Sequence, residues 1–222
     1  MTDDMRLFQF SYSPFAAKVR KCLELKGLEV EVVEVAYLDR RELVALTGGH
    51  VHVPVLDDGG KVVTDSARIT AYLDERYESS LRLDPLAVVV EQWAEGPLED
   101  VAFRVATPGL EARFAQIQGG REDARALFRV MKERRYGAGC VEAWRREADE
   151  LSARLVALLA PVAKKVGRQP FLLGETPTLA DAAVYGQLFM VEAGAPGWIA
   201  ACAPALRDWW ERLRAARGRR RG

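Results

Sequence analysis

The spacing of apolar residues divides the chain into a first part that mixes strand and helix patterns and a second part that is helical throughout. In the first part, β-branched and alternating runs predict strands over residues 6–10, 28–35, 53–56 and 61–64. Apolar residues at helical spacing predict helices over residues 15–26, 38–46 and 66–77. The predicted order is therefore βαβαββα, and its first strand–helix–strand unit implies a parallel pair.

From Leu86 onward the pattern is helical. It predicts helices over residues 86–106, 121–136, 141–166, 179–193 and 204–216. Glycine and proline predict breaks at Pro108-Gly109, Gly119-Gly120, 137–139, Gly167 and Pro170. We therefore expect an α/β domain over residues 1–80 and an all-α domain over residues 86–222, joined by a linker over 78–85.

The stretch from residue 50 to residue 69, HVHVPVLDDGGKVVTDSARI, carries the strongest local signals. Proline cannot donate to a strand ladder, so Pro54 predicts that Val53 lies where the sheet stops pairing with itself. If the bond between them is cis, the backbone N–H and C=O of Val53 turn outward and can pair with an extended peptide. Asp65-Ser66 then opens a helix, whose free N–H groups and carboxylate suit the zwitterionic end of a small peptide.

Ser13 precedes Pro14 at the start of the first predicted helix, where it is the natural N-cap. A hydroxyl at a helix N-terminus can also donate a hydrogen bond to an anion that the helix dipole stabilises. Lowering a thiol pKa by about two units needs roughly 2.7 kcal/mol, which one charge-assisted hydrogen bond and a helix N-terminus can supply together. On its own, however, Ser13 fits a plain capping residue better than a thiolate-binding one.

Taken together, these segments resemble the cytosolic glutathione transferase family. The family pattern is V-P-x-L followed by an E/D-S pair, and VPVL and DSARI match it in order and spacing. Thr178 and Asp181 form a T-x-x-D capping-box motif, which recurs in the second domain of that family. The resemblance, to a serine-type and bacterial-like member, implies a thioredoxin-like N-terminal domain and an all-helical C-terminal domain of the glutathione S-transferase type.

The resemblance implies an enzyme that activates glutathione as a thiolate and conjugates it to a small hydrophobic electrophile. Ser13 would stabilise the thiolate, and Tyr12 or Ser11 is the alternative hydroxyl donor. Phe15 is expected among the glutathione-binding residues. Two other functions stay open: a non-catalytic binding or scaffold protein on the same fold, and a glutathione-dependent isomerase or dehalogenase.

The same resemblance assigns the rest of the glutathione site. The backbone of Val53, before Pro54, would pair with the cysteinyl unit, while Asp65 and Ser66 would hold the γ-glutamyl end. His52 would lie beside the glycine end, where the family often has lysine. Aromatic residues of the helical part are candidates for the electrophile pocket, without a choice among Trp93, Phe103, Phe114, Phe128, Tyr136 and Trp144.

The composition limits which kinds of binding partner are expected. With 32 basic and 32 acidic residues the formal net charge is zero, so we expect no nucleic-acid partner, and the Arg-rich end is expected to be a solvated tail. No apolar run reaches the ~18 residues that a membrane span needs, and the first residues lack a signal-peptide core, which predicts a cytoplasmic protein. A homodimer is implied by the resemblance alone.

Metal and disulfide sites are not expected. Three distant cysteines form no CxxC or metal spacing, and Cys22, on an apolar helix face, is expected to be buried and inert. His50 and His52 could face one metal, but no further ligand is evident.

Overall fold

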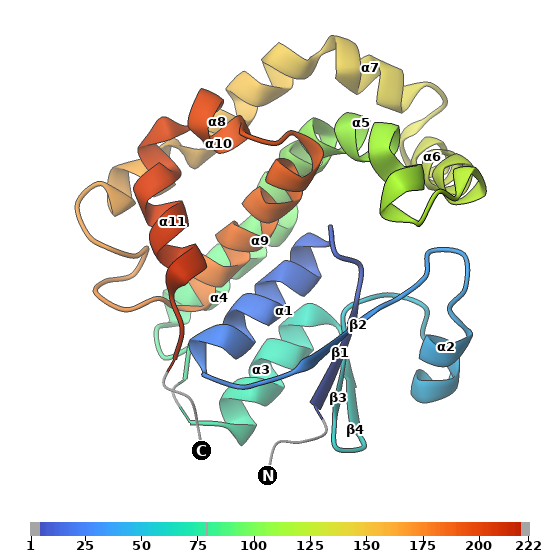
Figure 1. The fold of residues 1–222 in the computed structure, drawn as a ribbon. Helices are drawn as coiled ribbons and strands as arrows, with labels where there is room; N and C mark the ends of the chain where they lie inside the picture. The colour runs from blue at the N-terminus through green and yellow to red at the C-terminus, as the bar shows by residue number, and fades with distance from the viewer. Residues whose placement is uncertain (1–4, 79, 219–222) are drawn as a thin grey trace.

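A four-stranded mixed sheet forms the core of the N-terminal part in this computed structural model, which describes residues 5–78 and 80–218 (Figure 1). The strand order is β2-β1-β3-β4, with β1 parallel to β2 and antiparallel to β3. The elements of this part are β1 (Met5–Gln9), α1 (Pro14–Leu25), β2 (Glu31–Glu34), α2 (Arg41–Thr47), β3 (Val55–Asp58), β4 (Lys61–Thr64) and α3 (Ser66–Arg76). The predicted βαβαββα order and thioredoxin-like arrangement are confirmed.

The helices cover both faces of this sheet. In Figure 1, α1 and α3 lie between the sheet and the helical part, and α2 lies on the other side. Strand β2 is shorter than the predicted 28–35, because its partner β1 offers pairing only from Arg6 opposite Glu31 to Gln9 opposite Glu34. Leu28 instead closes the end of α1, donating its N–H to Leu23 O.

The second part is helical, as predicted, but its boundaries differ. Its elements are α4 (Pro85–Trp93), the π-helical turn η1 (Ala94–Leu98), α5 (Glu99–Ile117), α6 (Glu122–Tyr136), α7 (Cys140–Arg146), α8 (Ala148–Val166), α9 (Leu179–Gly194), α10 (Trp198–Cys202), the 3₁₀ turn η2 (Pro204–Leu206) and α11 (Arg207–Ala215). The predicted helix 141–166 is therefore two helices, and α10 was not predicted.

The predicted break at Pro108-Gly109 is wrong, because α5 runs through both residues. Gly109 instead allows α5 to pack closely against α9. A Cβ atom on Gly109 would lie 1.9 Å from the carbonyl oxygen of Gly194, so α5 and α9 approach at a distance that only glycine permits. The irregular turn of this long helical segment lies earlier, at η1, where Pro97 removes a backbone N–H.

One hydrophobic core runs through both parts of the molecule. It includes Leu7 and Leu23 of the first part and Leu155 and Leu188 of the second, all essentially inaccessible to solvent. Cys22 is buried in it as expected, and burial raises its pKa to about 12, which makes it inert at neutral pH. Within the described residues, none of the helices combines the length and apolar character that crossing a bilayer requires.

The capping-box motif is also present in the structure. Asp181 is fully buried at the start of α9 and accepts hydrogen bonds from Thr178 N at 3.0 Å, Leu172 N at 2.9 Å and Trp209 Nε1 at 2.9 Å. One carboxylate thus joins α9 to the preceding loop and to α11. The Arg-rich tail is described only to residue 218, and residues 219–222 lie outside the described part.

Candidate functional site

Three chain segments meet at one end of the sheet, and the strand register brings them there. Phe8 of β1 lies opposite Val55 of β3, so the residues that follow β1 lie beside those that precede β3. Val55 also lies opposite Thr64, the last residue of β4. The start of α1, the segment 50–54 and the start of α3 therefore share this end, and they contain the predicted site residues.

Ser13 is the N-cap of α1, as the sequence predicts. Its backbone is extended, and its Oγ accepts a hydrogen bond from Ala16 N at 3.3 Å. The side chain is buried, with 7% of the residue exposed. This bond uses a lone pair of the hydroxyl oxygen, so the hydroxyl hydrogen remains a donor for an anion at the helix N-terminus.

The two alternative hydroxyl donors have different surroundings. The Tyr12 ring stacks on Phe10 with centroids 5.5 Å apart and meets Phe114 of α5 edge-on at 5.4 Å. Burial raises the pKa of Tyr12 far above its usual range, so the phenol stays protonated and can act only as a neutral donor. Ser11 is exposed, and its backbone N–H donates to Glu34 Oε1 at 2.5 Å.

The Val53–Pro54 peptide bond is cis. Val53 is half-buried and lies two residues before Val55, the first residue of the ladder, which agrees with the predicted end of pairing. Phe15 follows Pro14 in the first turn of α1 and is half-buried.

Asp65 and Ser66 start α3, as predicted, but their side chains already have partners. Asp65 has a positive φ of 74° and caps the helix, because its Oδ1 accepts from Ala67 N at 3.0 Å and Arg68 N at 3.1 Å. Ser66 is buried, and its hydroxyl donates to Glu95 Oε1 at 3.3 Å. Asp65 is thus the exposed member of the pair, and Ser66 is oriented from the helical part.

Glu95 belongs to a buried charged cluster that sequence reasoning missed. Lys18 of α1 is 1% exposed, and its Nζ lies 2.6 Å from Glu91 Oε1 and 2.5 Å from Glu95 Oε1. Burial raises the pKa of Glu95 although Lys18 opposes that effect. The i, i+4 spacing of Glu91 and Glu95 was the only local signal for this cluster, and it does not identify Lys18 as the partner.

A third carboxyl group, that of Glu99, lies one turn beyond Glu95 on the same helical segment. Burial, with a further contribution from Glu95, raises the pKa of Glu99 to about 7. The side of the site next to Ser66 therefore carries the carboxyl group of Glu95, whose charge also acts on Glu99.

The opposite side, next to α2, carries cations. The Arg40 guanidinium lies 5.1 Å from the Phe10 ring centroid and 5.3 Å from that of Tyr37, and it donates to Val51 O at 2.7 Å. His52 is exposed, and its pKa is lowered by partial burial and by the neighbouring His50 and Arg40. Arg40 thereby fixes the segment that carries His52, a role that the sequence did not indicate.

The two histidines contact each other edge-on, with ring centroids 5.6 Å apart. Neither lies in a strand. Across residues 5–78 and 80–218, no group of three or more His, Cys, Asp or Glu side chains is arranged to hold a metal ion.

The candidate aromatic residues divide into separate groups. Phe114 and Phe128 stack at 4.2 Å beside Tyr12. Phe103, Tyr136 and Trp144 form a neighbouring cluster.

Trp93 is separate from both groups. It lines an apolar groove between α4 and α8.

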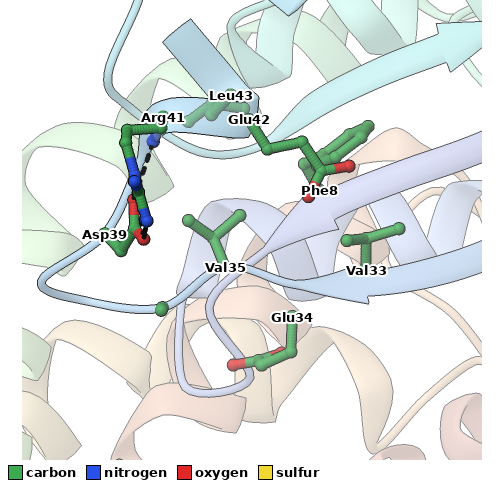
Figure 2. Close-up of a pocket in the computed structure, with 9 residues that line it drawn as sticks. Phe8, Val33, Glu34, Val35, Asp39, Arg41, Glu42 and Leu43 are labelled. Carbon is green, nitrogen blue, oxygen red and sulfur yellow. Dashed lines mark hydrogen bonds and ion pairs between the residues drawn. The ribbon is translucent and has the colours of Figure 1, made fainter. Parts of the chain in front are cut away.

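Two cavities lie near the sheet. One, of about 470 Å³, opens beside the β1–α1 connection and is lined by Ser11, Tyr12, Arg113, Gln116, Ile117, Phe189 and Ala193. The other, also about 470 Å³, lies between β2 and α2, where Figure 2 shows Val33, Val35 and Phe8 beside an Arg41–Asp39 ion pair. This second cavity contains none of the predicted site residues.

Two family models match the chain. The glutathione S-transferase N-terminal domain matches residues 7–81, and the glutathione S-transferase C-terminal domain matches residues 138–217. Together they span more than half of the chain. A probable glutathione S-transferase of Nicotiana tabacum is 30% identical over 145 residues, which are 61% of this chain and 64% of that protein. The chain thus matches less than two thirds of the length of this relative.

Solved structures share the fold. A glutathione transferase from Phanerochaete chrysosporium has a TM-score of 0.80 at 18% identity, covering 97% of this chain and 98% of that one. A glutathione S-transferase from Ceriporiopsis subvermispora, in complex with glutathione, has a TM-score of 0.75 at 20% identity, covering 95% of each chain. At these identities the likeness concerns the fold alone.

Proposed function

The chain belongs to the glutathione S-transferase family, and on that premise we propose that it binds glutathione as a thiolate and conjugates it to a small hydrophobic electrophile. The observation that supports this is the meeting of three segments at one end of the sheet. They supply a hydroxyl at a helix N-terminus, a backbone edge next to a cis-proline, and a second helix N-terminus with a carboxylate.

In this proposal Ser13 donates its hydroxyl hydrogen to the glutathione sulfur. The helix N-terminus and the hydrogen bond both favour the thiolate over the thiol, which lowers the thiol pKa towards neutrality. The thiolate then attacks the electrophile, the new C–S bond forms, and the leaving group departs with its bonding electrons. Tyr12, with its phenol protonated, is the alternative donor.

The remaining residues hold the peptide. The backbone of Val53, before Pro54, pairs with the cysteinyl unit, and the free carboxylate oxygen of Asp65 receives the γ-glutamyl ammonium. The backbone N–H of Ser66, which the Asp65 cap leaves unused, takes the γ-glutamyl carboxylate. Phe15 and His52 complete the contacts, with His52 near the glycine end. The homodimer, the division at residues 1–80 and 86–222, and the cytoplasmic location belong to the same proposal.

The test is a calorimetric titration with glutathione of the wild type, Ser13→Ala and Tyr12→Phe, together with ultraviolet absorbance of the bound thiolate. We expect Ser13→Ala to bind glutathione within about threefold of wild type but to raise the pKa of the bound thiol by about two units, or roughly 2.7 kcal/mol. Tyr12→Phe should leave that pKa unchanged.

Other outcomes reassign the function. If Tyr12→Phe raises the thiol pKa and Ser13→Ala does not, the phenol is the donor. If the wild type binds glutathione without lowering its pKa, the protein is a binding or scaffold member of the family. If glutathione is regenerated rather than consumed during turnover, the chemistry is that of an isomerase or dehalogenase.

A further inference from the structure

Lys132 lies on the face of α6 that also carries the buried residues Ala124 and Phe128. Its Nζ is 4.2 Å from the centroid of the Phe128 ring and 5.0 Å from that of Phe103. Phe128 in turn meets the Tyr12 ring edge-on, with centroids 6.2 Å apart. A single aromatic ring thus separates this ammonium group from the residue that precedes Ser13.

The charges around Lys132 are of its own sign. Lys132 is half-buried, and burial together with Arg135 and Arg40 lowers its pKa to about 8, while the Cys140 thiol opposes this shift. At pH 7 the amine is therefore still mainly protonated. Over residues 5–78 and 80–218, no carboxylate forms an ion pair with it. A half-buried cation beside further cations is unfavourable unless an anion accompanies it.

Other basic side chains of the same helix do have carboxylate partners. Arg125 Nε lies 3.1 Å from Glu111 Oε1, and Arg129 Nη1 lies 2.5 Å from Glu142 Oε1. The contrast concerns the direction in which each residue points. Arg125 and Arg129 face carboxylates of α5 and α7, whereas Lys132 points onto aromatic rings beside the candidate site, near Arg40 of the first part.

We propose that Lys132 binds an anionic substituent of the second substrate, so that the preferred electrophiles are aromatic compounds that carry a carboxylate. The half-buried ring of Phe103 would hold the aromatic part, and the ammonium would pair with the carboxylate. This inference rests on the proposed transferase function of the neighbouring Ser13 site.

Two matched electrophiles test it: 4-chloro-3-nitrobenzoate, which is anionic, and 4-chloro-3-nitrobenzamide, its neutral counterpart. In both, the glutathione sulfur attacks the carbon that bears chlorine. The C–S bond forms, the C–Cl bond breaks, chloride leaves with the bonding pair, and the thiol proton passes to solvent. The two compounds differ only in the substituent opposite the reacting carbon, a carboxylate in one and an uncharged carboxamide in the other, so each variant is compared with the wild type on the same compound.

The variants are Lys132→Met, which keeps the length and apolar contacts of the side chain, and Lys132→Arg, which keeps its charge. Lys164→Met, on the exposed face of α8, is the matched control. We expect Lys132→Met to lower kcat/KM for the benzoate by about tenfold or more, the size of one charge-assisted hydrogen bond. The benzamide rate and the KM for glutathione should stay within about twofold. Lys132→Arg should retain the preference for the benzoate.

An equal loss for both electrophiles, or a raised KM for glutathione with both, overturns the proposal, because Lys132 would then act on packing or on glutathione. Calorimetric titration with the benzoate alone distinguishes failure of the anion site from failure of the proposed transferase function. If the wild type turns over neither compound but binds the benzoate, and Lys132→Met does not, the anion site stands without the proposed chemistry. If both proteins bind it equally, or neither binds it, the site is refuted.

Discussion

At the scale of single residues, the candidate site is defined by which charges are buried and what faces them. The carboxyl group of Glu95 in η1 lies on the Ser66 side, where it accepts a hydrogen bond from the Ser66 hydroxyl. A cation, Arg40, lies on the α2 side over the Phe10 ring. A zwitterionic peptide has its ammonium at one end and a free carboxylate at the other, so this polarity suits one orientation of such a ligand.

Glu99 gives a prediction at this scale. Its folded-state pKa of about 7 lies above the ordinary value of a glutamate, so between those values the folded protein binds more protons than the unfolded chain. The free energy of unfolding should therefore fall as pH rises from about 4.5 to about 7. Glu95 and Asp100 favour the protonated form, and Arg135 opposes it.

The measurement is urea unfolding of the wild type and Glu99→Gln at pH 5 and pH 8. Glu99→Gln should remove this part of the pH dependence and be more stable than the wild type at pH 8 by about 1 kcal/mol, a value reduced for partial exposure of the side chain. If both proteins lose the same stability between the two pH values, Glu99 is not the group responsible.

At the scale of elements, helix α9 is the support for the N-terminal half of α1, and hence for Ser13. Gly186 of α9 lies against the backbone of α1, where an added Cβ atom would be 2.3 Å from Pro14 O and 3.2 Å from Lys18 N. Backbone atoms cannot yield as a flexible side chain can. The two helices therefore approach at a distance that depends on this glycine.

Gly186→Ala should force α1 and α9 apart. We expect a loss of about 2–3 kcal/mol of stability despite the better helix propensity of alanine, because overpacking against backbone outweighs that gain. Thermal and urea unfolding followed by circular dichroism will measure it. Gly96→Ala, where an added Cβ atom meets nothing within 4 Å, is the control and should be neutral or slightly stabilising. Equal effects of the two substitutions would contradict the packing argument.

At the scale of the whole molecule, the two parts are joined by more than apolar packing. Lys18 of the first part is buried against Glu91 and Glu95 of the second, with donor–acceptor distances of 2.6 and 2.5 Å. Arg82 and Thr70 extend the cluster. Such a cluster fixes how the parts are placed relative to each other, since a displacement would leave buried charges unpaired.

Lys18→Met tests this. Removal of the cation leaves two carboxylates in a buried cluster, so we expect a loss of about 3–5 kcal/mol in unfolding free energy. The triple variant Lys18→Met/Glu91→Gln/Glu95→Gln should recover part of that loss, because the two carboxylates that Lys18 neutralised are then uncharged. The exposed change Lys164→Met should cost less than about 0.5 kcal/mol. A Lys18→Met protein as stable as wild type would show that the cluster contributes nothing to the junction.

Local signals in the sequence predicted several features of the candidate site and of the helical part. Three features were predictable: the N-cap of α1 at Ser13, the end of strand pairing at Val53, and the Thr178–Asp181 capping box. Each depends on residues within four positions of one another. The break at Pro108-Gly109 was wrong because α9 packs against that glycine, and packing between distant helices is invisible to a local pattern. The assignment of Ser13, Asp65 and Ser66 to glutathione remains a prediction.

The sequence by itself determined the order of elements in the N-terminal part, the helix starts at Ser13 and Asp65, and the likeness to the glutathione transferase family, since periodicity, capping and short motifs are local properties. Only the tertiary structure decided which charges face the site. The partners Ser66 and Glu95 are 29 residues apart, and Lys18 and Glu91 are 73 apart. Phe128 is one turn from Lys132 on α6, but Phe103 comes to Lys132 only through the packing of α6 on α5. Contacts over such separations depend on how helices pack, and no periodicity in the chain encodes that.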